Sequence, residues 1–253
     1  MTDLQNSERV VLFVPGAMTG DWIWEDNFAQ AFSDAGYTVR TMSFRGHGAG
    51  LVERMSLRFD DYVKDCVTEI AKCSRAPHIV GHSLGGLIAL HAATNVPVKS
   101  MALLSPAPIG GMTRSIASLA ATSPISVFKF SAALLNARVT RYGTPPLGVY
   151  SPSCEPERAK AITAQLKPEA LPVILKLLAP PKLAVDRLDA NRILMVGAEG
   201  DRIIPASEVR RSAALINARF KSYKGMSHTF QAEREWPVVA MIFFVSLREP
   251  DTS

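Results

Sequence analysis

A serine between two glycines, at the end of an apolar run, is the residue of this chain best placed for covalent chemistry. Residues 78–80 are apolar apart from His78, residues 81–85 read Gly-His-Ser-Leu-Gly, and an apolar helical pattern follows at once. A G-x-S-x-G segment in this context is typical of a nucleophile elbow, where the serine sits on a strained turn with little bulk beside it. A plain glycine turn, with Ser83 as the N-cap of the helix, is the alternative interpretation. The partners available to Ser83 must decide between the two.

A histidine late in the chain is the best candidate for a base. A serine hydroxyl is a poor nucleophile at neutral pH and needs a base within hydrogen-bond reach. His228 follows the last predicted strand, and open parallel sheets form their sites at the carboxyl ends of strands. His82 is inside the elbow, where its side chain should point away from that of Ser83, and His47 lies in an early turn. We therefore predict that His228 activates Ser83.

The acid that orients the base is expected in the loop after the strand at 192–196. Residues 197–205 read Gly-Ala-Glu-Gly-Asp-Arg-Ile-Ile-Pro, so Asp201 follows a glycine turn. Glu199 is the competing carboxylate. The other position for an acid, after the strand that precedes residue 106, holds Ser105 and no carboxylate. We predict that Asp201 holds the histidine.

Two backbone amides are expected to stabilise the oxyanion of a tetrahedral intermediate. One belongs to Leu84, the residue after the nucleophile. The other must come from the loop after the first strand, where Pro15 has no amide hydrogen. We assign this donor to Ala17, with Met18 as the alternative.

Strands and helices alternate along most of the chain. Buried or alternating apolar patterns predict strands at 10–14, 38–44, 78–80, 99–104, 192–196 and 219–223, and helical spacing predicts helices at 24–35, 60–72, 84–93, 207–215 and 237–247. This alternation predicts an α/β fold, a mostly parallel sheet with helices on both faces.

The alternation stops between residues 106 and 187, where eleven of the 17 prolines lie. Helical pieces are predicted at 113–122, 125–139, 156–166 and 169–179. We interpret residues 106–187 as a helical cap inserted into a core formed by 1–105 and 188–253. Apolar side chains that face the elbow from this region and from the first loop would bind substrate, and the candidates are Met18, Met112, Phe128, Leu134 and Ile174.

The chain resembles the α/β-hydrolase fold superfamily. The order Ser83, Asp201, His228 matches the order of the triad in that fold. Residues 11–24 are similar to small esterases of the methylesterase and hydroxynitrile-lyase type, although those usually have histidine where Pro15 stands. Residues 44–48, Phe-Arg-Gly-His-Gly, resemble a turn of the fold in which the histidine is structural, and which usually carries an acid at the position of Ser43. The resemblance implies about six strands, because few residues precede the first one.

Composition limits the remaining possibilities. A chain of 253 residues that is 47% apolar can bury one full core. The net charge of +5 is scattered rather than grouped, so we expect no nucleic-acid partner. A polar start and the lack of a stretch of roughly 20 apolar residues predict neither a signal peptide nor a membrane span. Three cysteines suggest reduced thiols and a cytoplasmic location.

The sequence therefore predicts a serine hydrolase, without cofactor or metal, that acts through an acyl-enzyme on a small or medium carboxylic ester with an apolar part. Cleavage of carbon–carbon bonds, lactones or thioesters, or cyanohydrin lysis like that of hydroxynitrile lyases, could use the same triad. A ligand-binding protein without turnover is a third possibility, because the fold alone does not determine function. The oligomeric state is expected to be a monomer or homodimer.

Overall fold

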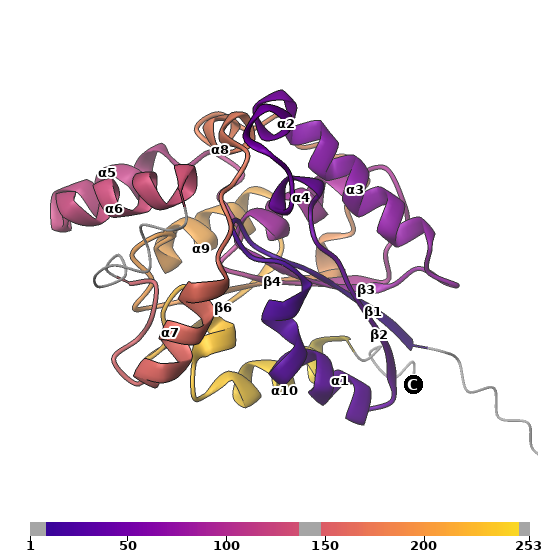
Figure 1. The fold of residues 1–253 in the computed structure, drawn as a ribbon. Coiled ribbons are helices and arrows are strands. Elements are labelled where there is room, and N and C mark those ends of the chain that lie inside the picture. The colour runs from indigo at the N-terminus through magenta and orange to yellow at the C-terminus, as the bar shows by residue number, and fades with distance from the viewer. Residues whose placement is uncertain (1–8, 137–147, 248–253) are drawn as a thin grey trace, which may run out of the picture.

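Six parallel strands form the sheet at the centre of the computed structural model, which describes residues 9–136 and 148–247. The strands lie in the order β2-β1-β3-β4-β5-β6 (Figure 1). Their bounds are β1 Arg9–Val14, β2 Tyr37–Thr41, β3 His78–His82, β4 Ser100–Leu104, β5 Ile193–Ala198 and β6 Arg219–Tyr223. The predicted α/β class and the number of strands are confirmed. From β1 the chain places β2 on one side and the later strands on the other, so that β2 and β6 are the edge strands.

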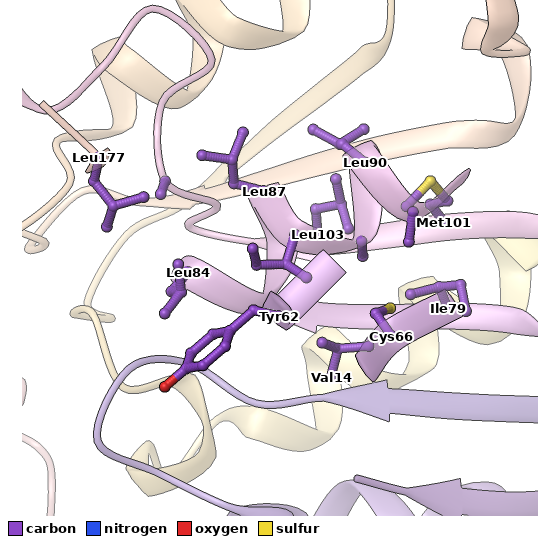
Figure 2. Close-up of a cluster of buried hydrophobic side chains, with 14 of the residues drawn as sticks. Val14, Tyr62, Cys66, Ile79, Leu84, Leu87, Leu90, Met101, Leu103 and Leu177 are labelled. Carbon is purple, nitrogen blue, oxygen red and sulfur yellow. The ribbon is translucent and has the colours of Figure 1, made fainter. Parts of the chain in front are cut away.

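Alternate residues of each central strand feed two separate cores. In β1, Leu12 and Val14 pack into one cluster, whereas Val11 and Phe13 pack into another on the opposite face. Figure 2 shows part of the first cluster, in which side chains of β1, β3 and β4 meet those of helices α3 (Phe59–Ala71) and α4 (Leu84–Ala93). This alternation is the period of a strand that is buried on both faces.

Helices cover both faces of the sheet, as predicted. Helices α3, α4 and α9 (Ala206–Leu215) lie on one face, and α1 (Gln30–Asp34) and α10 (Trp236–Leu247) lie on the other (Figure 1). Helix α4 is buried along nearly its whole length, which explains why its sequence is apolar all round rather than amphipathic.

The helical segment before β2 differs from the single helix predicted at 24–35. It begins as a 3₁₀ turn at Asp21–Trp24, widens into a π turn at Glu25–Ala29, and only then becomes α1. Asn27 lies in the π turn and is buried, and its side-chain amide donates to the carbonyl of Gln231 at 2.7 Å.

In the described parts of residues 106–187, which exclude 137–147, four α-helices lie between β4 and β5. They are α5 (Thr113–Thr122), α6 (Pro124–Leu135), α7 (Pro156–Gln165) and α8 (Leu171–Lys176). The predicted helix at 125–139 is thus shorter, and its residues 137–139 lie outside the described part of the chain. The predicted helix at 169–179 starts two residues later, because Glu169 is turned into the core instead. A further short helix, α2 (Leu51–Ser56), was not predicted: its apolar side chains are exposed and give no burial pattern.

Among the described residues, no helix combines the length and the apolar character that a bilayer crossing requires. The three cysteines, Cys66, Cys73 and Cys154, are free thiols, as the sequence suggested. Burial raises the pKa of the Cys66 thiol to about 12, which keeps this thiol protonated and unreactive at neutral pH.

Candidate active site

Ser83 lies on a sharp turn between β3 and α4. Its backbone has φ 52° and ψ −123°, a conformation that costs a non-glycine residue about 1–3 kcal/mol. The Ser83 amide donates to the carbonyl of Leu104 at 3.0 Å, which ties the turn to the end of β4. Its neighbours His82 and Leu84 are buried, whereas Ser83 itself is partly exposed. The turn therefore presents one hydroxyl at the carboxyl edge of the sheet.

The turn is possible because Gly85 passes against the first loop without a side chain. A Cβ at Gly85 would lie 2.1 Å from the carbonyl oxygen of Pro15 and 2.8 Å from that of Val14. Both obstacles are backbone atoms, which cannot rotate away as a side chain does. The second glycine of the pentapeptide thus brings the elbow and the first loop into contact.

Gly85→Ala is expected to lower the free energy of unfolding by about 1–3 kcal/mol, because the added methyl must displace the backbone of the first loop. Urea denaturation measures the change. Gly48→Ala is the matched control, since a Cβ there meets nothing within 4 Å, and it should change stability by less than about 0.5 kcal/mol. Equal stability of the two variants would contradict the contact.

His228 and Asp201 complete a hydrogen-bonded chain with Ser83. The Nε2 atom of His228 lies 3.1 Å from the Ser83 Oγ, and its Nδ1 lies 2.8 Å from Oδ2 of Asp201. Asp201 is 2% exposed, and its other oxygen accepts the amides of Ile203 and Ile204 at 2.8 Å each. The carboxylate is thereby fixed in place with one oxygen directed at the imidazole. The structure brings all three predicted residues together, whereas the Glu199 carboxylate, among the residues that the structure describes, accepts only from the Ser222 hydroxyl at 3.4 Å.

The loop that carries His228 is held by a second buried acid. The Glu233 carboxylate, 1% exposed, accepts the amide of Ser227 at 2.9 Å and both the amide and the hydroxyl of Ser151. The Gly148 carbonyl in turn accepts the His228 amide at 3.0 Å. Burial raises the pKa of Glu233, and these hydrogen bonds oppose the rise. Sequence reasoning missed Glu233, because it is a single acid with no motif around it.

His82 supports the same loop from inside the elbow. Its Nε2–H donates to the carbonyl of His228 at 2.9 Å, which requires a proton on Nε2. Burial, together with the neighbouring His228, lowers the pKa of His82 to about 3. His82 therefore remains neutral and holds the backbone of His228.

Of the two amides of the first loop that were considered as oxyanion donors, one is already hydrogen-bonded in the described part of the structure. The Met18 amide already donates to Oε2 of Glu169 at 2.9 Å, so it is not available. The amides of Ala17 and Leu84 have no hydrogen-bond partner among the described residues. Of the two candidates weighed from sequence, Ala17 is the one whose amide remains free.

Apolar side chains from the first loop and the inserted helices gather next to Ala17. Met18, Ala133 and Leu134 form a small buried cluster, with Phe130 and Ile174 packed against it. Three of the predicted substrate residues, Met18, Leu134 and Ile174, are thus brought together, and Met112 packs against the main core.

Phe128 does not join this cluster. Its side chain is 70% exposed, whereas Phe130, which the sequence analysis did not select, is the phenylalanine that packs there. Two residues along an α-helix turn the direction of a side chain by about 200°, so the two rings lie on opposite sides of α6. Phe128 therefore lies outside this cluster, and its contact with substrate stays a prediction.

Ser83 lies on a strained turn after β3, Asp201 follows β5, and His228 follows β6, all in one parallel sheet. This arrangement defines the class of enzymes that are built on a nucleophile elbow. Residues 11–240 match the profile of the alpha/beta hydrolase family, and the chain belongs to this family. No curated protein sequence is significantly similar to it.

Solved structures of hydrolases share the fold at low sequence identity. An extracellular alpha/beta-hydrolase from a Paenibacillus species, described as sharing structural and functional homology with tobacco salicylic acid binding protein 2, has 19% identity and a TM-score of 0.71, with 95% of this chain and 100% of that one covered. A carboxylesterase of the thaumarchaeon Nitrososphaera gargenis has 14% identity and a TM-score of 0.74, with coverage of 95% and 91%. Polyneuridine aldehyde esterase has 15% identity and a TM-score of 0.68, with coverage of 94% and 99%. Family and fold together support a hydrolase.

Proposed function

We propose that this protein is a cofactor-independent serine hydrolase that cleaves carboxylic esters through an acyl-enzyme. The observation that carries the proposal is the continuous chain of hydrogen bonds from Ser83 through His228 to Asp201, on a serine whose backbone has a positive φ. Serine, histidine and acid in these roles are the arrangement that acyl transfer requires.

Acylation begins when the Nε2 of His228 takes the proton of the Ser83 hydroxyl. The Ser83 oxygen then bonds to the ester carbon, and the carbonyl electron pair moves to its oxygen, where the amides of Ala17 and Leu84 stabilise the negative charge. Asp201 stabilises the imidazolium without taking its proton. Return of the electron pair breaks the bond to the alcohol oxygen, which receives the proton from His228.

Deacylation repeats these steps with water as the nucleophile. His228 removes a proton from water, hydroxide adds to the acyl carbon, and the bond to the Ser83 oxygen breaks as that oxygen regains a proton. The cluster around Met18 and Leu134 lies beside Ala17 and is apolar, which favours an ester with an apolar acyl or alcohol part. Residues 106–187 would act as the cap that supplies most of this surface.

A fluorophosphonate probe tests the proposal directly. We expect the wild-type protein to gain one phosphonyl group from the probe, whose phosphorus releases fluoride as it bonds to the serine oxygen. Peptide mapping should place this group on Ser83. Prior unfolding in urea should abolish the labelling, since it depends on His228 being within reach. Absence of labelling, or labelling at another residue, would contradict the proposal.

The same triad could cleave other bonds, so a substrate panel must accompany the probe. Structures similar to this chain also include a putative non-heme bromoperoxidase and MenH from S. aureus, which shows that the fold serves several chemistries. We expect p-nitrophenyl esters of medium chain length to turn over faster than a thioester, a lactone, a 1,3-diketone or a cyanohydrin. Faster turnover of one of these would reassign the substrate class and leave the triad in place. Binding of an ester without turnover would instead indicate a ligand-binding protein.

A further inference from the structure

We propose that Glu169 is a positioning residue for the oxyanion hole, which it controls by holding the backbone of Met18. This inference rests on the proposed function, because it concerns the amide of Ala17 as an oxyanion donor. Glu169 belongs to the inserted region, far from Met18 in sequence, and no part of the mechanism above uses it.

The Glu169 carboxylate is surrounded by donors from four parts of the fold. Its Oε2 accepts the Met18 amide at 2.9 Å and the Nε2–H of His47 at 2.7 Å. Its Oε1 accepts the amide of Ala170 at 2.8 Å and the hydroxyl of Tyr62. The side chain is 0% exposed, so these donors replace water completely. In Figure 2 the Tyr62 hydroxyl is turned away from the apolar side chains, in keeping with a polar partner outside that cluster.

The donors keep the buried carboxylate ionised. Burial on its own would raise the pKa of Glu169. This effect is outweighed by the hydrogen bond and charge of His47, together with the hydrogen bonds from Tyr62 and the Met18 amide. The pKa of Glu169 therefore lies below its ordinary value. An ionised acceptor forms the stronger hydrogen bond to the Met18 amide.

Met18 is held from both sides. Its carbonyl accepts the amide of Lys167 at 2.9 Å while its amide donates to Glu169, and its own φ is 65°. A non-glycine residue keeps such a conformation only when its surroundings enforce it. The Met18 amide belongs to the peptide group that joins Ala17 to Met18. Fixing the orientation of this group therefore restricts the backbone of Ala17, and with it the direction of the Ala17 N–H.

The same acid joins the oxyanion loop to the apolar cluster beside it. The backbone amide of Glu169 donates to the carbonyl of Leu134 at 3.0 Å, at the end of α6. Leu134 and the Met18 side chain pack together in that cluster. A single residue of the inserted region therefore fixes the oxyanion loop and the helix that would contact substrate.

Glu169→Gln tests the proposal, because it keeps the shape of the side chain and removes its charge and two of its acceptor sites. We expect kcat for p-nitrophenyl butyrate to fall at least about 10-fold, because loss of a whole oxyanion donor lowers kcat about 10²–10³-fold. The kcat is expressed per active site, as titrated with the fluorophosphonate probe. KM should change by less than about threefold. The inhibition constant of an alkyl boronic acid, which mimics the tetrahedral intermediate, should rise by the same factor as kcat/KM falls.

Glu208→Gln is the matched control. Glu208 is also buried, at 8% exposure, but lies in α9 and pairs with Arg211, so its replacement should leave kcat and the boronate constant within about twofold. A purely structural role for Glu169 predicts a lower melting temperature with unchanged kcat per titrated site, and this result would overturn the proposal. If the glutamine variant does not fold, Glu169→Asp, which keeps the charge but withdraws it from Met18, must show the same loss of kcat and of boronate affinity.

Hydrogen–deuterium exchange separates the failure of this inference from that of the proposed function. The Met18 amide should exchange faster in Glu169→Gln than in wild type, whatever the reaction of the enzyme. Faster exchange in a protein that the probe does not label would reject the hydrolase mechanism alone. Normal exchange together with normal kcat would reject the role of Glu169 alone.

Discussion

Replacing Ser83 with alanine is expected to lower kcat/KM for p-nitrophenyl butyrate by at least about 10⁴-fold, to the residual rate that binding and the oxyanion amides provide. His228 then has no hydroxyl to deprotonate, although it keeps its bond to Asp201. Steady-state kinetics with active-site concentration taken from absorbance measures this, and circular dichroism should show an unchanged fold.

Ser115→Ala is a suitable control for the loss of a serine hydroxyl. Ser115 is 1% exposed and its hydroxyl has no partner among the described residues, so its removal should change kcat/KM by less than about twofold. Comparable losses in the two variants would mean that the effect of Ser83→Ala is not specific to the nucleophile. Retention of activity in Ser83→Ala would disprove the acyl-enzyme mechanism.

Asp201→Asn should lower kcat roughly 10⁴-fold while leaving the local structure intact. The asparagine oxygen can still accept the amides of Ile203 and Ile204, but its NH₂ group then faces the Nδ1 of His228. To accept that hydrogen bond at Nδ1, the imidazole must carry its proton on Nε2. The Nε2 atom then has no free lone pair and can no longer take the proton of Ser83. Steady-state kinetics across pH 5–9 measures the loss.

Glu199→Gln decides between the two acids that the sequence offered. The Glu199 side chain contacts only the Ser222 hydroxyl in the described residues, so its replacement should reduce kcat by less than about threefold. A loss in Glu199→Gln as large as that in Asp201→Asn would reverse the assignment of the orienting acid.

The parts of the site that could be predicted from sequence are those governed by short-range rules. A strand that ends in Gly-x-Ser-x-Gly and runs into a helix has few alternatives, because its turn excludes a side chain two residues before the serine and two residues after it. Asp201 and His228 could be inferred because parallel strands carry their functional loops at one edge. The sheet itself followed from strands and helices that alternate along the chain.

The parts that could not be predicted depend on contacts between distant segments. Glu169 was assigned to a helix because the piece 169–179 between prolines looks helical, and only the three-dimensional arrangement shows that His47, Tyr62 and Met18 direct their donors at it. The packing of Phe130, rather than Phe128, on the small cluster could not be predicted for a related reason: both are apolar, and only the contact surface of α6 distinguishes them.

The path of the chain through the sheet has a kinetic consequence for the enzyme. Strands β4 and β5 are neighbours, yet residues 105–192 separate them, and Ser83 precedes that excursion whereas Asp201 and His228 follow it. During synthesis, a chain that has emerged only as far as the inserted region has the proposed nucleophile but neither the proposed base nor the proposed acid. Pairing across so long a loop is also slow. Catalytic activity should therefore be among the last properties to appear when the protein folds, later than its helical content.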